Sequence, residues 1–221
     1  MGNVGEGYMP FEGSRTYWRV VGERTEKLPL LTLHGGPGAA HGYMTSLDDL
    51  AKGGRQVIYY DQCGCGKSHA PSNPGRWTTE FFVEELQALH KYLNLEHFHM
   101  LGHSWGGMLA ICFACSRPKG LAGLVLVSSP VSIAHLKGID LTPFLAGIDV
   151  PTLVTAGQFD HCTPKVVRIL LNGISGSRSM ILEKSGHLAH VEERETFNNG
   201  VEAFLAEVEA KRERVFSPAT C

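Results

Sequence analysis

Short apolar runs alternate along the chain with longer segments in which apolar residues recur every three or four positions. The short runs are rich in β-branched and aromatic residues, as in QVIYY, and therefore predict strands. The run LAGLVLVS is apolar throughout, as expected of a strand that is covered on both faces. The predicted strands cover residues 8–11, 17–21, 28–33, 56–60, 97–102, 121–128, 152–156 and 179–182, the first two as an N-terminal hairpin.

The longer segments have the spacing of amphipathic helices. In residues 78–93, Phe82, Leu86 and Leu89 recur at helical spacing, and Thr78 or Thr79 can cap the helix. The predicted helices cover residues 43–51, 78–93, 105–116, 165–171 and 192–212. Strands separated by helices of this length predict a mostly parallel sheet with right-handed crossovers and helices on both faces, which is an α/β fold.

Composition narrows the class of protein further. Hydrophobic residues make up 43% of the 221 residues, charged residues make up 19%, and the formal net charge is −2. This balance predicts a folded core rather than a disordered chain. Without a basic excess we expect no nucleic-acid partner, and without an apolar run of about 18 residues we expect no membrane span. The N-terminal segment has no signal-peptide pattern, so we expect a cytoplasmic protein with free cysteines.

A serine nucleophile is predicted at the end of one strand. Residues 102–106 (GHSWG) fit G-x-S-x-G between a predicted strand and a predicted helix. A nucleophile elbow needs this context, because the tight turn raises the serine hydroxyl above the sheet at a helix N-terminus. A glycine-rich turn with a purely structural role would give the same pentapeptide. The position between a predicted strand and a predicted helix favours Ser104 as the nucleophile.

A serine nucleophile also needs a base, and the base needs an acid that orients it. In this class of fold the order along the chain is Ser, then Asp or Glu, then His. Asp160 and His187 each follow a predicted strand, and ligands bind at the carboxyl ends of strands in open α/β sheets. We expect His187 to be the general base and Asp160 to orient it. Asp140 and Asp149 are weaker candidates for the acid.

Two backbone N–H groups are expected to stabilise the oxyanion. One belongs to Trp105, the residue after the nucleophile. The other is expected to be that of Gly36, in the glycine-rich turn after the strand 28–33, where glycine permits a close approach and Pro37 stiffens the loop.

Several other motifs are interpreted as structural. Residues 61–68 (DQCGCGKS) resemble a phosphate loop, but the glycines are too close together for G-x-x-x-x-G-K-S, so Asp61 is expected to support the site by hydrogen bonds. C-x-C and C-x-x-C pairs occur without a further pair at zinc-ligand spacing, so we expect core thiols and no metal. His34 and His103 are expected to brace loops.

Five motifs together resemble the proline iminopeptidase family of α/β-hydrolases. The resemblance runs over residues 8–205, nearly the whole chain. Its motifs are HGGPG at 34–38, DQxGxGxS at 61–68, GHSWGG at 102–107, GxxD at 157–160 and SGH at 185–187.

This resemblance implies an α/β-hydrolase fold and the release of N-terminal proline or other residues from peptides, or hydrolysis of amino-acid amides, without a cofactor. It implies a triad of Ser104, Asp160 and His187, with an oxyanion hole of Gly36 and Trp105. The family has a large helical cap where this chain has only residues 131–148. We therefore expect a single domain, residues 1–221, with this short connector in place of the cap.

The predicted function is cleavage of an amide or peptide bond through an acyl-enzyme. An esterase or amidase acting on a small acyl group, a catalytically degenerate binding protein, and a non-hydrolytic use of the same triad are the alternatives. Ser104 at the elbow argues against epoxide hydrolase and dehalogenase chemistry, which need a carboxylate there. We expect a small-molecule or short-peptide substrate and a possible homodimer through the uncapped face.

Overall fold

A computed structural model describes residues 4–70, 75, 77–133, 139–161 and 164–216. Its centre is an eight-stranded sheet. The strands lie in the order β1 (Val4–Phe11), β2 (Ser14–Val21), β4 (Val57–Tyr60), β3 (Leu30–Leu33), β5 (Phe98–His103), β6 (Leu121–Val127), β9 (Thr152–Gly157) and β10 (Arg178–Leu182).

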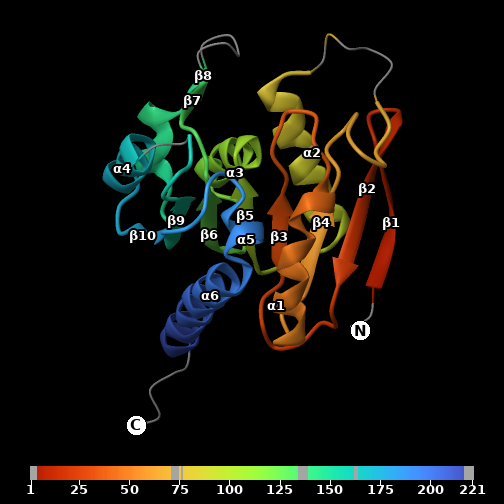
Figure 1. Cartoon of the computed structure of the whole chain (residues 1–221). Helices are drawn as coiled ribbons and strands as arrows, with labels where there is room; N and C mark the ends of the chain where they lie inside the picture. Colours follow the sequence, from red (N-terminus) through yellow and green to blue (C-terminus); the bar gives the residue numbers. More distant parts are fainter. Residues whose placement is uncertain (1–3, 71–74, 76, 134–138, 162–163, 217–221) are drawn as a thin grey trace.

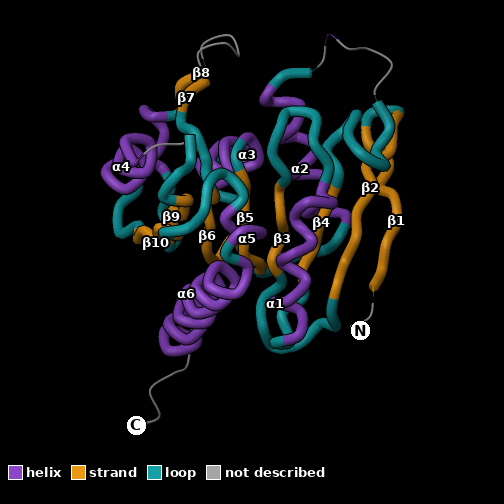
Figure 2. The backbone as a smooth tube through the Cα atoms, viewed as in Figure 1, coloured by secondary structure: helices purple, strands orange, loops and turns teal. Residues whose placement is uncertain are grey.

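Most of the sheet is parallel, as predicted. β1 pairs with β2 and β2 with β4 in antiparallel register, and every pair from β4 to β10 is parallel. The loops that follow β3, β5, β6 and β9 therefore lie along one edge of the sheet, where Figure 2 draws them in teal. Residues from distant parts of the chain meet at this edge.

Helices cover both faces of the sheet (Figure 1). One buried cluster joins the sheet to α2 and α3, and contains Leu86, Met108 and Leu126. A second cluster joins the opposite face to α1 and α6, and contains Leu50 and Phe197. The helices are α1 (Asp48–Lys52), α2 (Thr79–Tyr92), α3 (Trp105–Cys115), α4 (Pro164–Gly173), α5 (Ala189–Glu192) and α6 (Arg194–Phe216), with 3-10 helices at His41–Leu47 and Thr142–Gly147.

Three segments differ in detail from the prediction. The segment predicted as a helix over 43–51 begins with the 3-10 helix, and the one predicted over 192–212 is divided between α5 and α6. The connector 131–148 contains a short antiparallel pair, β7 (Ser132–Ile133) with β8 (Ile139–Asp140). Pairing between two-residue strands depends on tertiary contacts and leaves no periodic pattern in the sequence, which is why this pair was not predicted.

Candidate active site

Ser104 has the backbone geometry of a nucleophile elbow. It lies between β5 and α3 with φ 53° and ψ −121°, a conformation that non-glycine residues rarely adopt. Its N–H donates to the carbonyl oxygen of Val127 on β6 at 2.8 Å. The turn is therefore fixed to the neighbouring strand, and the serine lies at the edge formed by the carboxyl ends of the parallel strands.

The flanking glycines are required by close backbone contacts. A Cβ on Gly102 would lie 2.4 Å from the carbonyl oxygen of Gly106, and a Cβ on Gly106 would lie 2.2 Å from that of Leu33. Both distances are far below van der Waals contact. The G-x-S-x-G pattern thus results from the packing of the elbow against β3.

Asp160 and His187, predicted from their positions after strands, lie within hydrogen-bonding distance. Nδ1 of His187 donates to Oδ1 of Asp160 at 2.9 Å. The Asp160 side chain is fully buried, whereas the His187 side chain is about a quarter exposed (26%). A buried carboxylate on Nδ1 fixes the imidazole tautomer in which Nε2 is free to accept a proton.

A hydrogen-bonded chain connects three loops of the site. The N–H of Gly35 donates to the hydroxyl of Tyr43 at 2.6 Å, and that hydroxyl lies 2.8 Å from Nδ1 of His103. Nε2 of His103 lies 2.9 Å from the carbonyl oxygen of His187. Because a carbonyl can only accept, Nε2 of His103 carries the proton and Nδ1 accepts from Tyr43.

Burial keeps this histidine neutral. It lowers the pKa of His103 to about 3, so both ring nitrogens hold fixed roles near neutral pH. A Cβ on Gly35 would lie 3.1 Å from both the Cβ of Ser104 and the hydroxyl of Tyr43, so the glycine-rich turn is packed directly on the elbow. His103 therefore braces loops, as predicted, but the part played by Tyr43 was missed because the sequence shows it only as part of a helical segment.

His34 connects the glycine-rich turn 34–38 to the glycine-containing segment 61–68. The N–H of Gln62 donates to Nε2 of His34 at 2.9 Å, and the side-chain amide of Gln62 donates to the His34 carbonyl oxygen at 2.7 Å. The indole N–H of Trp105 donates to Oε1 of Gln62 at 3.0 Å. His34 thus joins the turn containing Gly36 to the start of α3.

The two predicted oxyanion donors, Gly36 and Trp105, belong to the two segments that the hydrogen bonds of His34 and Gln62 connect. Trp105 is the first residue of α3, where helix N–H groups lack an intrahelical acceptor. Gly36 has φ 131°, in the region that favours glycine. The N–H of its neighbour Gly35 is already used by Tyr43, which favours Gly36 as the donor from this turn.

Asp61 supports the site in the way predicted. Its Oδ1 accepts from the backbone N–H of His41 at 2.8 Å, and its Oδ2 accepts from that of Lys67 at 2.8 Å. The weaker acid candidates have partners other than His187: Asp140 accepts from the N–H of Thr142, and Asp149 forms a 3.6 Å ion pair with Arg117.

The described cysteines are free thiols, but not all are buried. Cys63 and Cys65 are buried, whereas Cys112 and Cys115 are only partly buried, in contrast to the core positions predicted for that pair. Burial raises the pKa of Cys63, Cys65 and Cys112 to about 11, so these thiols are protonated near neutral pH. Cys162 and Cys221 lie outside the described residues.

A cavity of about 590 Å³ opens beside the elbow. This volume is in the range of small-molecule sites. Its wall is mainly apolar, and Glu80 is the one charged residue among the described residues that line it. The residues that line it include Pro37, Gly38, Trp77, Phe82, Trp105 and Ile139. It thus lies against both predicted oxyanion loops.

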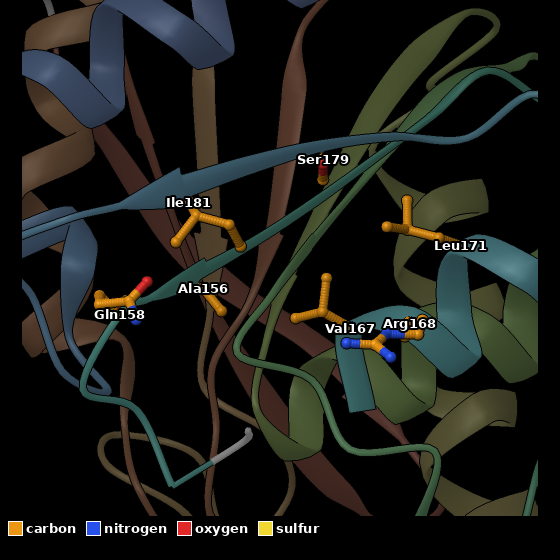
Figure 3. Close-up of a pocket in the computed structure, with 8 residues that line it drawn as sticks. Ala156, Gln158, Val167, Arg168, Leu171, Ser179 and Ile181 are labelled. Atoms are coloured by element: carbon orange, nitrogen blue, oxygen red, sulfur yellow. The ribbon is translucent and has the colours of Figure 1, made fainter. Parts of the chain in front are cut away.

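A smaller cavity of about 200 Å³ lies between α4 and the edge strand β10. Figure 3 shows side chains from β9, α4 and β10 around it, with Arg168 as the labelled charged residue. None of the predicted site residues lines it. We therefore place the candidate site at the larger cavity.

His161 was missed as a neighbour of His187, although it directly follows Asp160. Its ring lies on that of His187, with centroids 4.1 Å apart and planes inclined by 34°. Its Nδ1 lies 3.6 Å from Oδ1 of Asp160. Two imidazoles therefore face one carboxylate oxygen.

The fold and the elbow define an α/β hydrolase. The family model of the alpha/beta hydrolase fold matches residues 29–141, about half of the chain. The chain belongs to this family and is a hydrolase. Relatives in sequence narrow the family further.

The chain belongs to the proline iminopeptidase family. It is 34% identical to a proline iminopeptidase of Lactobacillus helveticus, with 87% of this chain and 94% of that protein covered. It is 50% identical to one of Lactiplantibacillus plantarum over 161 residues, which covers 70% of this chain and 56% of that protein. The solved proline iminopeptidase of Mycobacterium smegmatis superposes with a TM-score of 0.87 at 27% identity, covering 94% of this chain and 100% of that one.

The alignment with the Lactobacillus helveticus protein also shows a deletion. It runs over 277 residues, more than the 221 of this chain, although it covers only 87% of the chain. The relative therefore has internal residues without a counterpart here, which fits a missing cap. None of the helices in the described part of the chain combines the length and the apolar composition that a membrane span requires.

Proposed function

We propose that this protein is a serine hydrolase that releases an N-terminal residue, proline above all, through an acyl-enzyme on Ser104. The observation that carries this proposal is the 2.9 Å bond between His187 and a fully buried Asp160, beside a serine held at φ 53°. Family membership supports the reaction class, since the relatives named above are proline iminopeptidases.

The proposed reaction has two steps. His187 takes the Ser104 proton on Nε2 while Oγ attacks the substrate carbonyl, and Asp160 stabilises the imidazolium that forms. The N–H groups of Gly36 and Trp105 hold the oxyanion. As the amide bond breaks, His187 gives its proton to the leaving amine. Water, activated in the same way, then hydrolyses the ester and restores Ser104.

We further propose that the 590 Å³ cavity takes the residue to be released. Trp77, Phe82 and Trp105 provide an apolar wall for a proline ring. A free α-amino group is largely protonated at neutral pH, and Glu80 is the charged lining residue that complements it. Glu80 would then supply an amine contact from α2, without a cap.

The test compares a prolyl arylamide with a short-chain aryl ester that has no amine. We expect Glu80→Gln to raise KM for the prolyl arylamide roughly tenfold, because a hydrogen bond to a charged group contributes about 1.5 kcal/mol. The ester should be affected little. Glu84→Gln is the matched control, because Glu84 is exposed on the same helix and does not line the cavity.

Two outcomes would argue against this assignment. Equal losses for both substrates would remove Glu80 as an amine contact. Cleavage of the ester without cleavage of the prolyl arylamide would favour the esterase alternative, which the short connector 131–148 makes reasonable. A homodimer through the uncapped face stays a prediction.

A further inference from the structure

The acid–base side of the site contains one more potential ligand than a triad needs. Within the described part of the chain, Asp160, His161 and His187 offer one ligand atom each, and the three atoms lie within 4.8 Å of one another. The set is one carboxylate and two imidazoles, the same donor types that hold zinc in several catalytic sites. The His161 side chain is 73% exposed, so an ion has access from solvent.

The distances suit a small tetrahedral ion. Zinc binds histidine nitrogen and carboxylate oxygen at about 2.0–2.1 Å, so two ligand atoms of a tetrahedral site lie about 3.3 Å apart. Here Oδ1 of Asp160 lies 2.9 Å from Nδ1 of His187 and 3.6 Å from Nδ1 of His161. The two observed distances bracket the ideal one. The His161 ring is exposed, so it is free to turn and adjust the longer distance.

We propose that Asp160, His161 and His187 bind a zinc-type divalent cation and that the bound ion switches off the base. A metal on Nδ1 of His187 replaces the hydrogen bond to Asp160. The neutral ring must then carry its proton on Nε2, the atom that has to accept the proton of Ser104. The ion thus holds His187 in the tautomer that cannot act as a base. This inhibition rests on the proposed function, whereas cation binding does not.

Binding is tested on the full chain after removal of metals with a chelator. Cobalt is the probe, because four-coordinate cobalt with nitrogen ligands absorbs strongly in the visible, and zinc should displace it. We expect His161→Asn to weaken binding at least ~100-fold, since even an outer partner of a metal ligand carries 10–100-fold in affinity. His97→Asn is the matched control, because His97 is an exposed histidine at the opposite, amino end of β5.

Inhibition is read from labelling of Ser104 by a fluorophosphonate with increasing zinc. We expect zinc to block labelling of wild type and of His97→Asn, and His161→Asn to need at least ~100-fold more zinc. Equal zinc sensitivity in all three proteins would overturn the site. So would the absence of cobalt binding to wild type.

The two proposals fail in different ways. If folded wild type is not labelled even without zinc, the serine hydrolase proposal fails, while the cobalt titration still decides the cation site. Because His161 is exposed, its substitution leaves the core intact, and circular dichroism checks this. His161→Gln provides the same comparison if the Asn variant folds poorly.

Discussion

The site has a nucleophile side, around the proposed nucleophile Ser104, and a base side, around the proposed base His187. The two sides are supported by different kinds of groups. Around Ser104, the support is neutral and mostly buried: the half-buried Tyr43 and the buried His103 connect the glycine-rich turn to the elbow. The loop that carries His187 shares one bond with His103, but two of its other backbone bonds come from the surface. The carboxylate of Glu192 accepts from the N–H of Gly186 at 2.7 Å and from that of Leu188 at 3.1 Å.

This difference in support matches the proposed roles of Ser104 and His187. Ser104 must stay in a strained backbone conformation. Such a conformation persists only where many surrounding contacts hold the residue in place. The base must take up and return a proton, and its loop lies where water reaches it. A second imidazole, His161, shares the carboxylate only on this exposed side. The predictions below test the difference between the two sides, beginning with the largest effect.

Removal of the nucleophile should have the largest effect. Ser104→Ala should lower kcat about a million-fold, as in serine proteases, because no hydroxyl remains to form the acyl-enzyme. The variant should fold as wild type does, which thermal unfolding checks. Turnover comparable to that of wild type would show that another residue carries the chemistry.

Loss of the Tyr43 hydroxyl should have the next largest effect. Tyr43→Phe leaves the N–H of Gly35 and Nδ1 of His103 without their partner, at a cost of roughly 1–3 kcal/mol for a buried group. His103 can then shift its proton and lose its bond to the His187 loop. We expect kcat to fall about 10- to 100-fold, with a much smaller change in KM.

The control is Tyr92→Phe, since the Tyr92 hydroxyl is bonded to the carbonyl oxygen of Tyr8 at the surface, at 3.3 Å. This variant should keep wild-type kinetics. A Tyr43→Phe variant with unchanged kcat would show that the elbow keeps its conformation without the hydrogen bonds of Tyr43. The nucleophile side would then need no stricter support than the base side.

A buried carboxyl on the nucleophile side should make stability depend on pH. Glu85 accepts from Thr16 and from the N–H of Cys63 in the wall of the cavity, and burial raises its pKa from 4.5 to about 7. The folded state thus binds this proton more tightly than the unfolded chain. Its contribution is complete below pH 4.5 and is lost as the pH rises to about 7.

Urea unfolding at about pH 5 and about pH 8 measures this contribution. Wild type should lose at most about 3 kcal/mol of unfolding free energy from this group between the two values. Glu85→Gln, which cannot titrate, should remove that part of the pH dependence. A variant with the same pH profile as wild type would contradict the raised pKa.

The smallest effect is expected on the base side. Glu192→Ala removes the acceptor of two N–H groups, but water can replace it because the side chain is exposed. We expect kcat to fall only a few-fold, about 1 kcal/mol or less. Glu195→Ala is the control, at another exposed position close by. A loss as large as that of Tyr43→Phe would show that both sides need equally strict support.

The sequence predicts those parts of the molecule that local patterns encode. Strands, helices and the elbow follow from periodicity and from glycines at fixed spacing, and Asp160 and His187 follow from their place after strands. Tyr43 could not be found in this way, because its partner His103 is 60 residues away in the chain. The ring contact of His161 likewise depends on how two loops approach each other, as does the pairing of β7 with β8.

The central claim, that Ser104 is a nucleophile activated by His187, is tested most directly by reaction with a fluorophosphonate followed by peptide mapping. Wild type should gain one adduct, on the peptide that contains Ser104. The adduct should be absent from Ser104→Ala and should form far more slowly in His187→Ala. A folded wild-type protein that stays unlabelled, or that is labelled at another residue, would contradict the account.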